Sequence, residues 1–168
     1  MSTRSTRLAA PSTPAWPLLT PEGRQELQAR IDDIRAVRLP SLRPLLVERE
    51  RDERDVREFE RLLKEVGELE ALVASADVID LDAAPFDGRL RLGMRTRITL
   101  ADDAEVWVRP VHPAEAHLDS ERISMTSPLA TAILGCRVGD LVWIDAPTGV
   151  WATRILEIDP APEGRQRP

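Results

Sequence analysis

The feature that most constrains the fold is an unbroken apolar repeat in the middle of the chain. Across residues 59–76 large apolar residues recur at alternating spacings of three and four, at Phe59, Leu62, Val66, Leu69, Val73 and Ala76. This heptad spacing places one apolar stripe along a helix whose other faces carry charge. Such a stripe has to be buried, so the sequence predicts a helix that packs lengthwise against another helix.

The partner helix is predicted just upstream. Thr20 precedes Pro21, and a Thr N-cap followed by Pro at the first helical position is a typical helix start. A second apolar stripe follows at spacings of four and three, at Leu27, Ile31 and Ile34. Two stripes on consecutive helices predict an antiparallel coiled-coil hairpin over residues 18–77.

The position of the hairpin turn has two solutions. Pro40 and Pro44 each either kink the first helix or mark its end. A turn at Leu39–Pro44 would give a short first arm and a long second arm. The geometric middle of the hairpin falls instead near Val47–Glu50.

The pattern changes from helical to alternating at Val78. The stretch RTRITLADDAEVWVRPV predicts a β-hairpin around an Asp-Asp turn, and RVGDLVWIDAPTGVWATRILEI predicts another around Pro147-Thr148-Gly149. Between them, RISMTSP predicts a short strand and LATAILG a short helix closed by Gly135. The fold class is therefore α+β: a helical hairpin, then a β-rich domain over residues 78–159 with about five strands and one short helix.

Composition excludes several classes of function. The net charge of −6 argues against a nucleic-acid binder held by phosphate contacts and against a membrane-surface protein. The single cysteine, Cys136, allows no intramolecular disulfide, which predicts a protein of the reducing cytoplasm. Cys136 itself is predicted to be a small packing residue. His112 and His117 lack the Cys/His neighbours of a zinc site. Residues 1–17 and 160–168 are predicted to be tails, the first disordered and without a secretion signal.

The most specific stretch is ISMTSPLATAILGCRVGDLVWIDAPTGVWATRILEI. It carries Ser-Pro, Leu-Gly, Val-Gly-Asp and Pro-x-Gly landmarks in the order and spacing of the Gre transcription elongation factors (GreA and GreB). Over residues 18–159 the chain resembles this family and its shorter relative, the regulator of nucleoside diphosphate kinase. The resemblance implies an FKBP-like C-terminal domain that docks on the rim of the secondary channel of bacterial core RNA polymerase. It also implies a coiled coil that enters the channel, and no active site or sequence-specific nucleic-acid binding in the chain itself.

The resemblance identifies a docking loop. Its residues match the family's rim-docking segment: Ser124, Thr126, Ser127, Pro128 and Leu129. A residue before proline is held extended, so we expect a stiff loop that presents Leu129 at low entropic cost. The plain alternative is a strand-to-helix connection in which Ser127 is only the N-cap.

The resemblance also assigns the hairpin tip. Cleavage-stimulating members carry an acidic pair there that shares a Mg²⁺ ion with the polymerase. The candidates in this chain are Glu48, Glu50, Asp52, Glu53, Asp55 and Glu58, with Asp52, Asp55 and Glu58 expected to share the metal. The nearest motif match, Asp55–Phe59, has Phe where the family has Asn, and Phe59 is in register with the apolar repeat. The alternative is that these acidic residues form an ordinary solvated helix face on which they alternate with arginines.

The hairpin is shorter than in the cleavage factors. A loss of about four residues per arm would retract the tip by about 6 Å, whereas metal ligation tolerates only a few tenths of an ångström. We therefore expect a monomeric regulator that enters the channel and modulates, or inhibits, elongation or initiation; the alternative is an active cleavage factor.

A prolyl isomerase is a rival from another class, but its activity would need an aromatic-lined pocket, and the chain has no Tyr and only two Phe. An intermolecular coiled-coil dimer is a further alternative. Trp107, Trp143 and Trp151 are predicted to pack in the core or on a sheet face.

Overall fold

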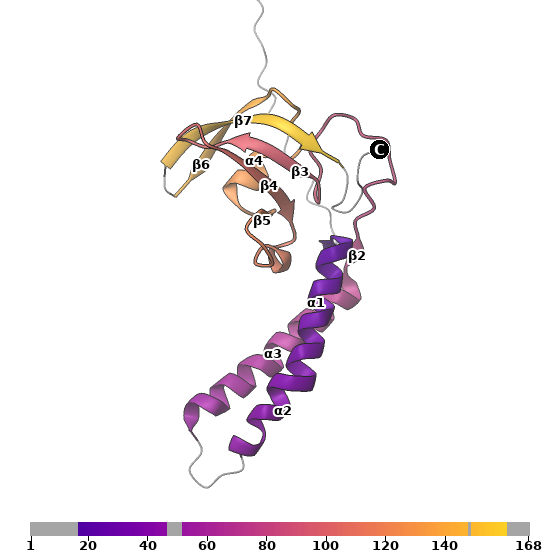
Figure 1. The fold of residues 1–168 in the computed structure, drawn as a ribbon, viewed down its shortest axis with the longest axis vertical. Coiled ribbons are helices and arrows are strands. Elements are labelled where there is room, and N and C mark those ends of the chain that lie inside the picture. Colours follow the sequence, from indigo (N-terminus) through magenta and orange to yellow (C-terminus); the bar gives the residue numbers. More distant parts are fainter. Residues whose placement is uncertain (1–16, 47–51, 148, 161–168) are drawn as a thin grey trace, which may run out of the picture.

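The structure is a computed structural model that describes residues 17–46, 52–147 and 149–160. It has the predicted α+β class, with a helical hairpin projecting from a β domain (Figure 1). The predicted tails fall almost wholly outside the described residues and stay predictions. In the part of the chain that is described, no helix has the length and apolar content to cross a membrane.

The first arm of the hairpin begins as the sequence predicts. Thr20 is the N-cap of α1 (Pro21–Asp33), and its side chain accepts a hydrogen bond from the backbone N–H of Gly23 at 2.9 Å. Just before it, β1 (Leu18–Leu19) pairs with β2 (Asp77–Val78), which follows the second arm. The two ends of the hairpin are thus joined at its base.

The first arm continues through Pro40, so a turn at Leu39–Pro44 is wrong. After α1 come one π-helical turn (Ile34–Arg38), α2 (Leu39–Leu42) and a 3₁₀ turn (Pro44–Leu46). In the π turn the N–H of Leu39 bonds to the carbonyl of Ile34, five residues back. A proline ring clashes with the carbonyl four residues before it in a regular α-helix. The wider π turn changes that spacing directly ahead of Pro40, which lets the arm continue.

The second arm is α3 (Glu53–Ser75), capped by Asp52, whose Oδ1 accepts from the N–H of Arg54 at 2.8 Å. The apolar repeat is buried against the first arm as predicted, in a core of Leu27, Ile31, Ile34, Leu39, Leu62, Val66 and Val73 with Phe59 and Leu69 packed beside it. Ion pairs between the arms flank this core: Arg30–Glu65, Arg35–Glu70 and Arg38–Glu58. The segment between the arms, 47–51, lies outside the described residues.

The β domain is one five-stranded sheet in the order β5-β4-β3-β7-β6. Its strands are β3 (Arg95–Thr99), β4 (Glu105–Val111), β5 (Arg122–Ser124), β6 (Leu141–Ala146) and β7 (Gly149–Asp159). Both predicted hairpins are present, β3–β4 and β6–β7, and β5 pairs with β4 in parallel. The Asp-Asp turn of the first hairpin has Asp103 at a φ of 62°, a conformation that Asp tolerates better than most residues.

The predicted short helix is α4 (Pro128–Ile133), which packs against β6. Gly135 follows it with a φ of 82°, the left-handed geometry that favours glycine. The core of the domain contains Leu90, Met94, Ile98, Val108, Ile133, Ile155 and Ile158. Cys136 packs against this core as predicted, and burial raises the pKa of its thiol.

The tryptophan prediction is wrong for one residue. Trp107 and Trp151 are half-buried, and the guanidinium carbon of Arg95 lies 4.9 Å from the centre of the Trp107 ring. Trp143, in contrast, is 68% exposed. Alternation along β6 buries its neighbour Ile144 and places Trp143 on the opposite face of the sheet, where no described element covers it.

Candidate functional site: the docking loop, the hairpin end and the joint between them

The predicted docking loop connects β5 to α4. The Ser127 side chain caps α4 by accepting from the N–H of Ala130 at 3.2 Å, so its structural role is present. The Ser124 and Thr126 hydroxyls are hydrogen-bonded to each other at 2.8 Å, which tightens the loop. Pro128 and Thr126 are exposed. The loop is therefore both a connection and a stiff surface that a partner could contact.

Leu129 is placed differently from the expectation. It is half-buried and packs against the core of the β domain. Its side chain is thus committed in part to the domain itself. The residues of this loop that a partner could reach without disturbing the core are Thr126 and Pro128.

The acidic residues predicted for the tip lie in two places. Glu48 and Glu50 fall in segment 47–51, outside the described residues. The other four, Asp52, Glu53, Asp55 and Glu58, lie on the first turns of α3 or at its cap. The Asp55–Phe59 segment is already helix, and Phe59 packs in the hairpin core.

Most of these carboxylates already have partners in the chain. Glu58 bonds Arg61 at 2.7 Å and Arg38 of the first arm at 3.2 Å. The hydrogen bond from Arg61 lowers the pKa of Glu58, with the nearby charges of Arg61 and Arg38 acting in the same direction against a weaker effect of burial. Glu53 pairs with Arg57 at 3.1 Å. These contacts hold both carboxylates on the helix, and they favour the ionised form of Glu58.

The described carboxylates near the hairpin end are already used for contacts within the chain. The Asp52 carboxylate is used as the helix cap, and Glu58 is bound by two guanidinium groups. Among the described residues, no group of three or more Asp, Glu, His or Cys side chains is arranged to hold a metal ion. Mg²⁺ prefers octahedral oxygen coordination and keeps several waters, so a carboxylate already bonded to arginine is a poor ligand.

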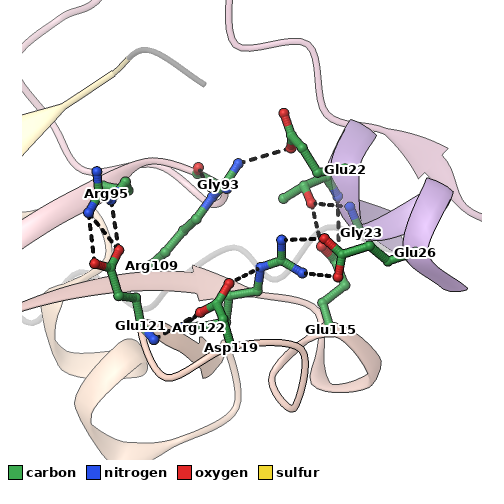
Figure 2. A network of polar contacts seen from close by, with 11 residues as sticks. Glu22, Gly23, Glu26, Gly93, Arg95, Arg109, Glu115, Asp119, Glu121 and Arg122 are labelled. Carbon is green, nitrogen blue, oxygen red and sulfur yellow. Dashed lines mark hydrogen bonds and ion pairs between the residues drawn. The ribbon is translucent and has the colours of Figure 1, made fainter. Parts of the chain in front are cut away.

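A third group of residues joins the hairpin to the β domain and was not foreseen from the sequence. We call it the joint; it consists of Thr20, Glu22, Gly23 and Glu26 at the start of α1 and Arg109, Glu115, Asp119 and Arg122 of the β domain. All residues of the joint except Thr20 are labelled in Figure 2. Its members come from segments about 90 residues apart, which brings the base of the hairpin against β4, β5 and the turn between them.

Glu115 is the centre of the joint. It lies in the 3₁₀ turn Pro113–Glu115, which is capped by the His112 side chain, and it is fully buried. Its Oε1 accepts from the N–H of Thr20 at 3.0 Å and its Oε2 from the Thr20 hydroxyl. The carboxyl therefore sits at the N-terminus of α1, where the helix dipole favours negative charge. Burial raises the pKa of Glu115, opposed by the bonds from Thr20 and the charges of Arg122 and Arg109.

Gly23 is required by this geometry. A Cβ atom at this position would lie 1.8 Å from Oε2 and 2.2 Å from Cδ of Glu115. A glycine in the first turn of a helix is the one sequence signal that could have indicated a close approach here. It does not say which residue approaches.

Two buried arginines complete the joint. Arg109 donates through Nε to the carbonyl of Gly93 at 2.8 Å and pairs with Glu22 at 3.1 Å. The Arg122 guanidinium donates one hydrogen bond to each carboxylate oxygen of Glu26, at 3.0 and 3.1 Å. Bidentate arginine–carboxylate pairs fix orientation as well as distance. Together with Glu115, these contacts hold α1 at three points along its first two turns (Figure 2).

Comparison with known proteins agrees with this architecture. A family model described as "Transcription elongation factor, GreA/GreB, C-term" matches residues 87–160. The transcription elongation factor GreA of Chloroflexus aggregans is 30% identical over 151 residues, which cover 83% of this chain and 95% of that protein. GreA of Nitrosococcus oceani is 28% identical with the same coverage.

A solved structure is also similar in sequence. The GreA factor homolog 1 (Gfh1) of Thermus thermophilus is 27% identical, and the match covers 85% of this chain and 98% of that one, with a TM-score of 0.37. The GreA relatives, matched along nearly their whole length, establish the identity. The chain belongs to the GreA/GreB family of transcription elongation factors.

Proposed function

We propose that this protein binds bacterial core RNA polymerase in the cytoplasm, docks with the loop 124–129 on the rim of the secondary channel and inserts its helical hairpin into the channel. Family membership and the shape of the molecule support this proposal. The first arm, Pro21–Leu46, has 26 residues between those bounds and reaches about 39 Å at 1.5 Å per residue. In this role the chain is a factor that acts on another enzyme and has no active site of its own.

The observation that carries the mode of action is the pairing of the acidic side chains near the hairpin end. Glu53 and Glu58 are neutralised by Arg57, Arg61 and Arg38, and Asp52 is used as a cap. To bind a metal, Glu58 would have to give up two guanidinium partners. We therefore infer that the hairpin occupies the channel without delivering strong metal ligands, which makes the protein a modulator of elongation or initiation that tends to inhibit.

Transcript cleavage is the second candidate, and one observation favours it. Asp55 and Glu58 keep the three-residue acidic spacing, and on a helix residues three apart lie on the same face. If these two carboxylates shared a Mg²⁺ ion with the polymerase, the chain would stimulate cleavage of a backtracked transcript.

The deciding experiment uses purified core polymerase on a backtracked complex with end-labelled RNA. We expect the wild-type protein to bind the polymerase and to reduce RNA extension when nucleotides are added. We expect no Mg²⁺-dependent shortening of the RNA beyond that of the polymerase alone. Strong shortening that is lost in Asp55→Asn would overturn the inhibitory mode and establish the second candidate.

A separate variant tests docking. Thr126→Arg places a bulky charge on the exposed loop without touching the core, and should abolish both binding and inhibition. Ala101→Arg is a matched control, because it adds the same charge at an exposed position in the β3–β4 turn, at the end of β4 away from the residues that pair with β5. If Thr126→Arg binds the polymerase like wild type, the assignment of the docking loop is wrong.

A further inference from the structure

The turn between α4 and β6 carries an exposed apolar side chain that the fold does not need. Residues 137–140 form a type II turn, in which the N–H of Asp140 donates to the carbonyl of Arg137 at 3.1 Å and Gly139 has a φ of 90°. Val138 occupies the second position of this turn and is 56% exposed. Its side chain takes no part in the contacts that form the turn.

The backbone of this turn is firmly held. Oδ2 of Asp140 accepts from the N–H of Arg137 at 2.8 Å. The N–H of Gly139 donates to the carbonyl of Ile155 at 2.8 Å, and the N–H of Ile155 donates to the carbonyl of Asp140 at 3.0 Å. A side chain on a segment fixed in this way loses little conformational entropy when a partner binds. Val138 is therefore preorganised as a contact residue.

The apolar surface continues from the turn onto β6. Leu141 is 54% exposed and Trp143 is 68% exposed, whereas Ile144 is buried on the other side of the sheet. Residues directly opposite in an antiparallel pair share a face, so Ala152 lies on the exposed face beside Trp143. Large exposed apolar residues that gather on one surface mark an interaction site more often than a solvated surface.

Arg154 shows that the turn lies beside this face of β6. It is the cross-strand partner of Leu141, and its Nη1 donates to the carbonyl of Gly139 at 3.3 Å. One side chain thus contacts the turn from a position opposite the first residue of β6. Val138 and the exposed side chains of β6 therefore belong to one continuous surface.

Arginines surround these apolar side chains. Arg137 precedes Val138 and forms an isolated β-bridge with Arg89. Arg89 and Arg154 donate to backbone carbonyls at 2.9 and 3.3 Å, and in the described part of the chain none of the three arginines forms an ion pair. The nearby carboxylates of Asp87 and Asp140 accept from backbone N–H groups instead. We call the whole surface the arginine-rimmed patch; it consists of Arg89, Arg137, Val138, Leu141, Trp143 and Arg154.

We propose that the arginine-rimmed patch is a second contact with core RNA polymerase, outside the docking loop, and that it binds an acidic surface of the polymerase with an apolar depression for Trp143 and Val138. This inference rests on the proposed function. An apolar centre with a rim that contains arginine is the usual composition of a protein–protein interface. A nucleic acid would use the arginines for its phosphates and leave Val138 and Leu141 uncovered.

The position of the patch favours the same partner as the docking loop. α4 begins in the docking loop at Pro128, packs against β6 and leads into the turn that carries Val138. Its six residues span only about 9 Å at 1.5 Å per residue. A standard interface covers about 800 Å² of each partner, which is about 30 Å across. One surface of the polymerase therefore spans both the docking loop and the patch.

The charges favour an acidic partner surface at this place in particular. The chain as a whole has a net charge of −6, so its other surfaces tend to repel an acidic partner. The three arginines of the patch attract it. This arrangement orients the encounter and adds specificity to the apolar contact.

Binding of the full chain to purified core polymerase, measured by biolayer interferometry, tests the proposal. Trp143→Ser and Val138→Ser remove apolar contacts without adding charge. We expect the dissociation constant to rise about tenfold for Trp143→Ser, since an aromatic anchor is lost, and about threefold for Val138→Ser. Val78→Ser is the matched control and should bind like wild type, because Val78 is an exposed valine in the separate two-stranded sheet at the base of the hairpin.

Charge reversal tests the rim. The Arg137 side chain is exposed, so Arg137→Glu changes the charge of the patch without disturbing the core. We expect this variant to bind about tenfold more weakly than wild type. Added salt should weaken wild-type binding more than binding of the variant, because the attraction that salt screens is already lost. Far-ultraviolet circular dichroism and thermal melting show that each variant is folded.

The outcomes separate this inference from the proposed function. If Trp143→Ser and Val138→Ser bind like wild type while Thr126→Arg does not bind, the docking loop stands and the second contact is overturned. If Arg137→Glu alone weakens binding, the patch contacts nucleic acid in the complex, which also overturns the proposal. If the wild-type chain does not bind core polymerase, the proposed function and this inference both fail.

Discussion

The substitution Gly23→Ala tests the joint with a single methyl group. The added Cβ would lie 1.8 Å from Oε2 of Glu115, whose side chain is fully buried and hydrogen-bonded to Thr20. Glu115 would have to rotate away and lose both hydrogen bonds from Thr20. At about 2 kcal/mol for each bond to a carboxylate, the loss is about 4 kcal/mol. Alanine recovers about 1 kcal/mol by its better helix propensity. The net loss in the free energy of unfolding is therefore about 3 kcal/mol.

The chain offers a matched control in Gly67→Ala. Gly67 lies exposed inside α3, and a Cβ there would have no neighbour within 4 Å. This variant should be more stable than wild type by about 1 kcal/mol. Urea unfolding followed by circular dichroism measures both. Gly23→Ala that is as stable as wild type would refute the reasoning. In a Glu115→Ala background, where the space is free, the penalty of Gly23→Ala should largely disappear.

Three further variants test the hairpin end and the joint. Arg61→Ala should raise the pKa of Glu58, measured by carboxyl NMR titration, because the strongest hydrogen bond to that carboxylate is lost. Glu115→Gln tests linkage to pH. Because the pKa of Glu115 is raised in the folded state, the folded protein binds more protons at this carboxyl than the unfolded chain does. The contribution of Glu115 to folding stability is therefore fully present below its unfolded pKa and is lost as pH rises through its folded pKa. Wild type should therefore lose stability relative to Glu115→Gln as pH rises through this window, in urea unfolding at several pH values. Asp52→Ala should cost about 1 kcal/mol of stability by removing the cap of α3, with no effect on polymerase pull-down.

Local sequence patterns predicted the helices and strands well. The heptad repeat, the Thr20–Pro21 helix start and the two strand hairpins depend on periodicity and turn chemistry, which act over a few residues. Pro40 illustrates the limit of such rules. A proline signals a break, and the chain instead inserted a π turn ahead of it. Nothing in the residues around Pro40 distinguishes these two outcomes.

The joint could not be predicted for a different reason. Thr20 and Glu115 are separated by 95 positions, and their contact depends on how the two parts of the fold meet. Arg109 and Arg122 look like solvent-facing strand residues until Glu22 and Glu26 are placed opposite them. Trp143 was misjudged because alternation along β6 shows which residues share a face but not which face is covered.

The joint also determines how accurately the hairpin can be aimed. An arm of about 39 Å turns each degree of rotation at its base into about 0.7 Å of travel at its far end. A metal ligand needs to be placed within a few tenths of an ångström, so delivery of a carboxylate would require the base to be fixed to within about half a degree. Simply filling a channel tolerates several degrees. The stiffness of eight residues at one end of the molecule therefore sets which kinds of chemistry the other end can take part in.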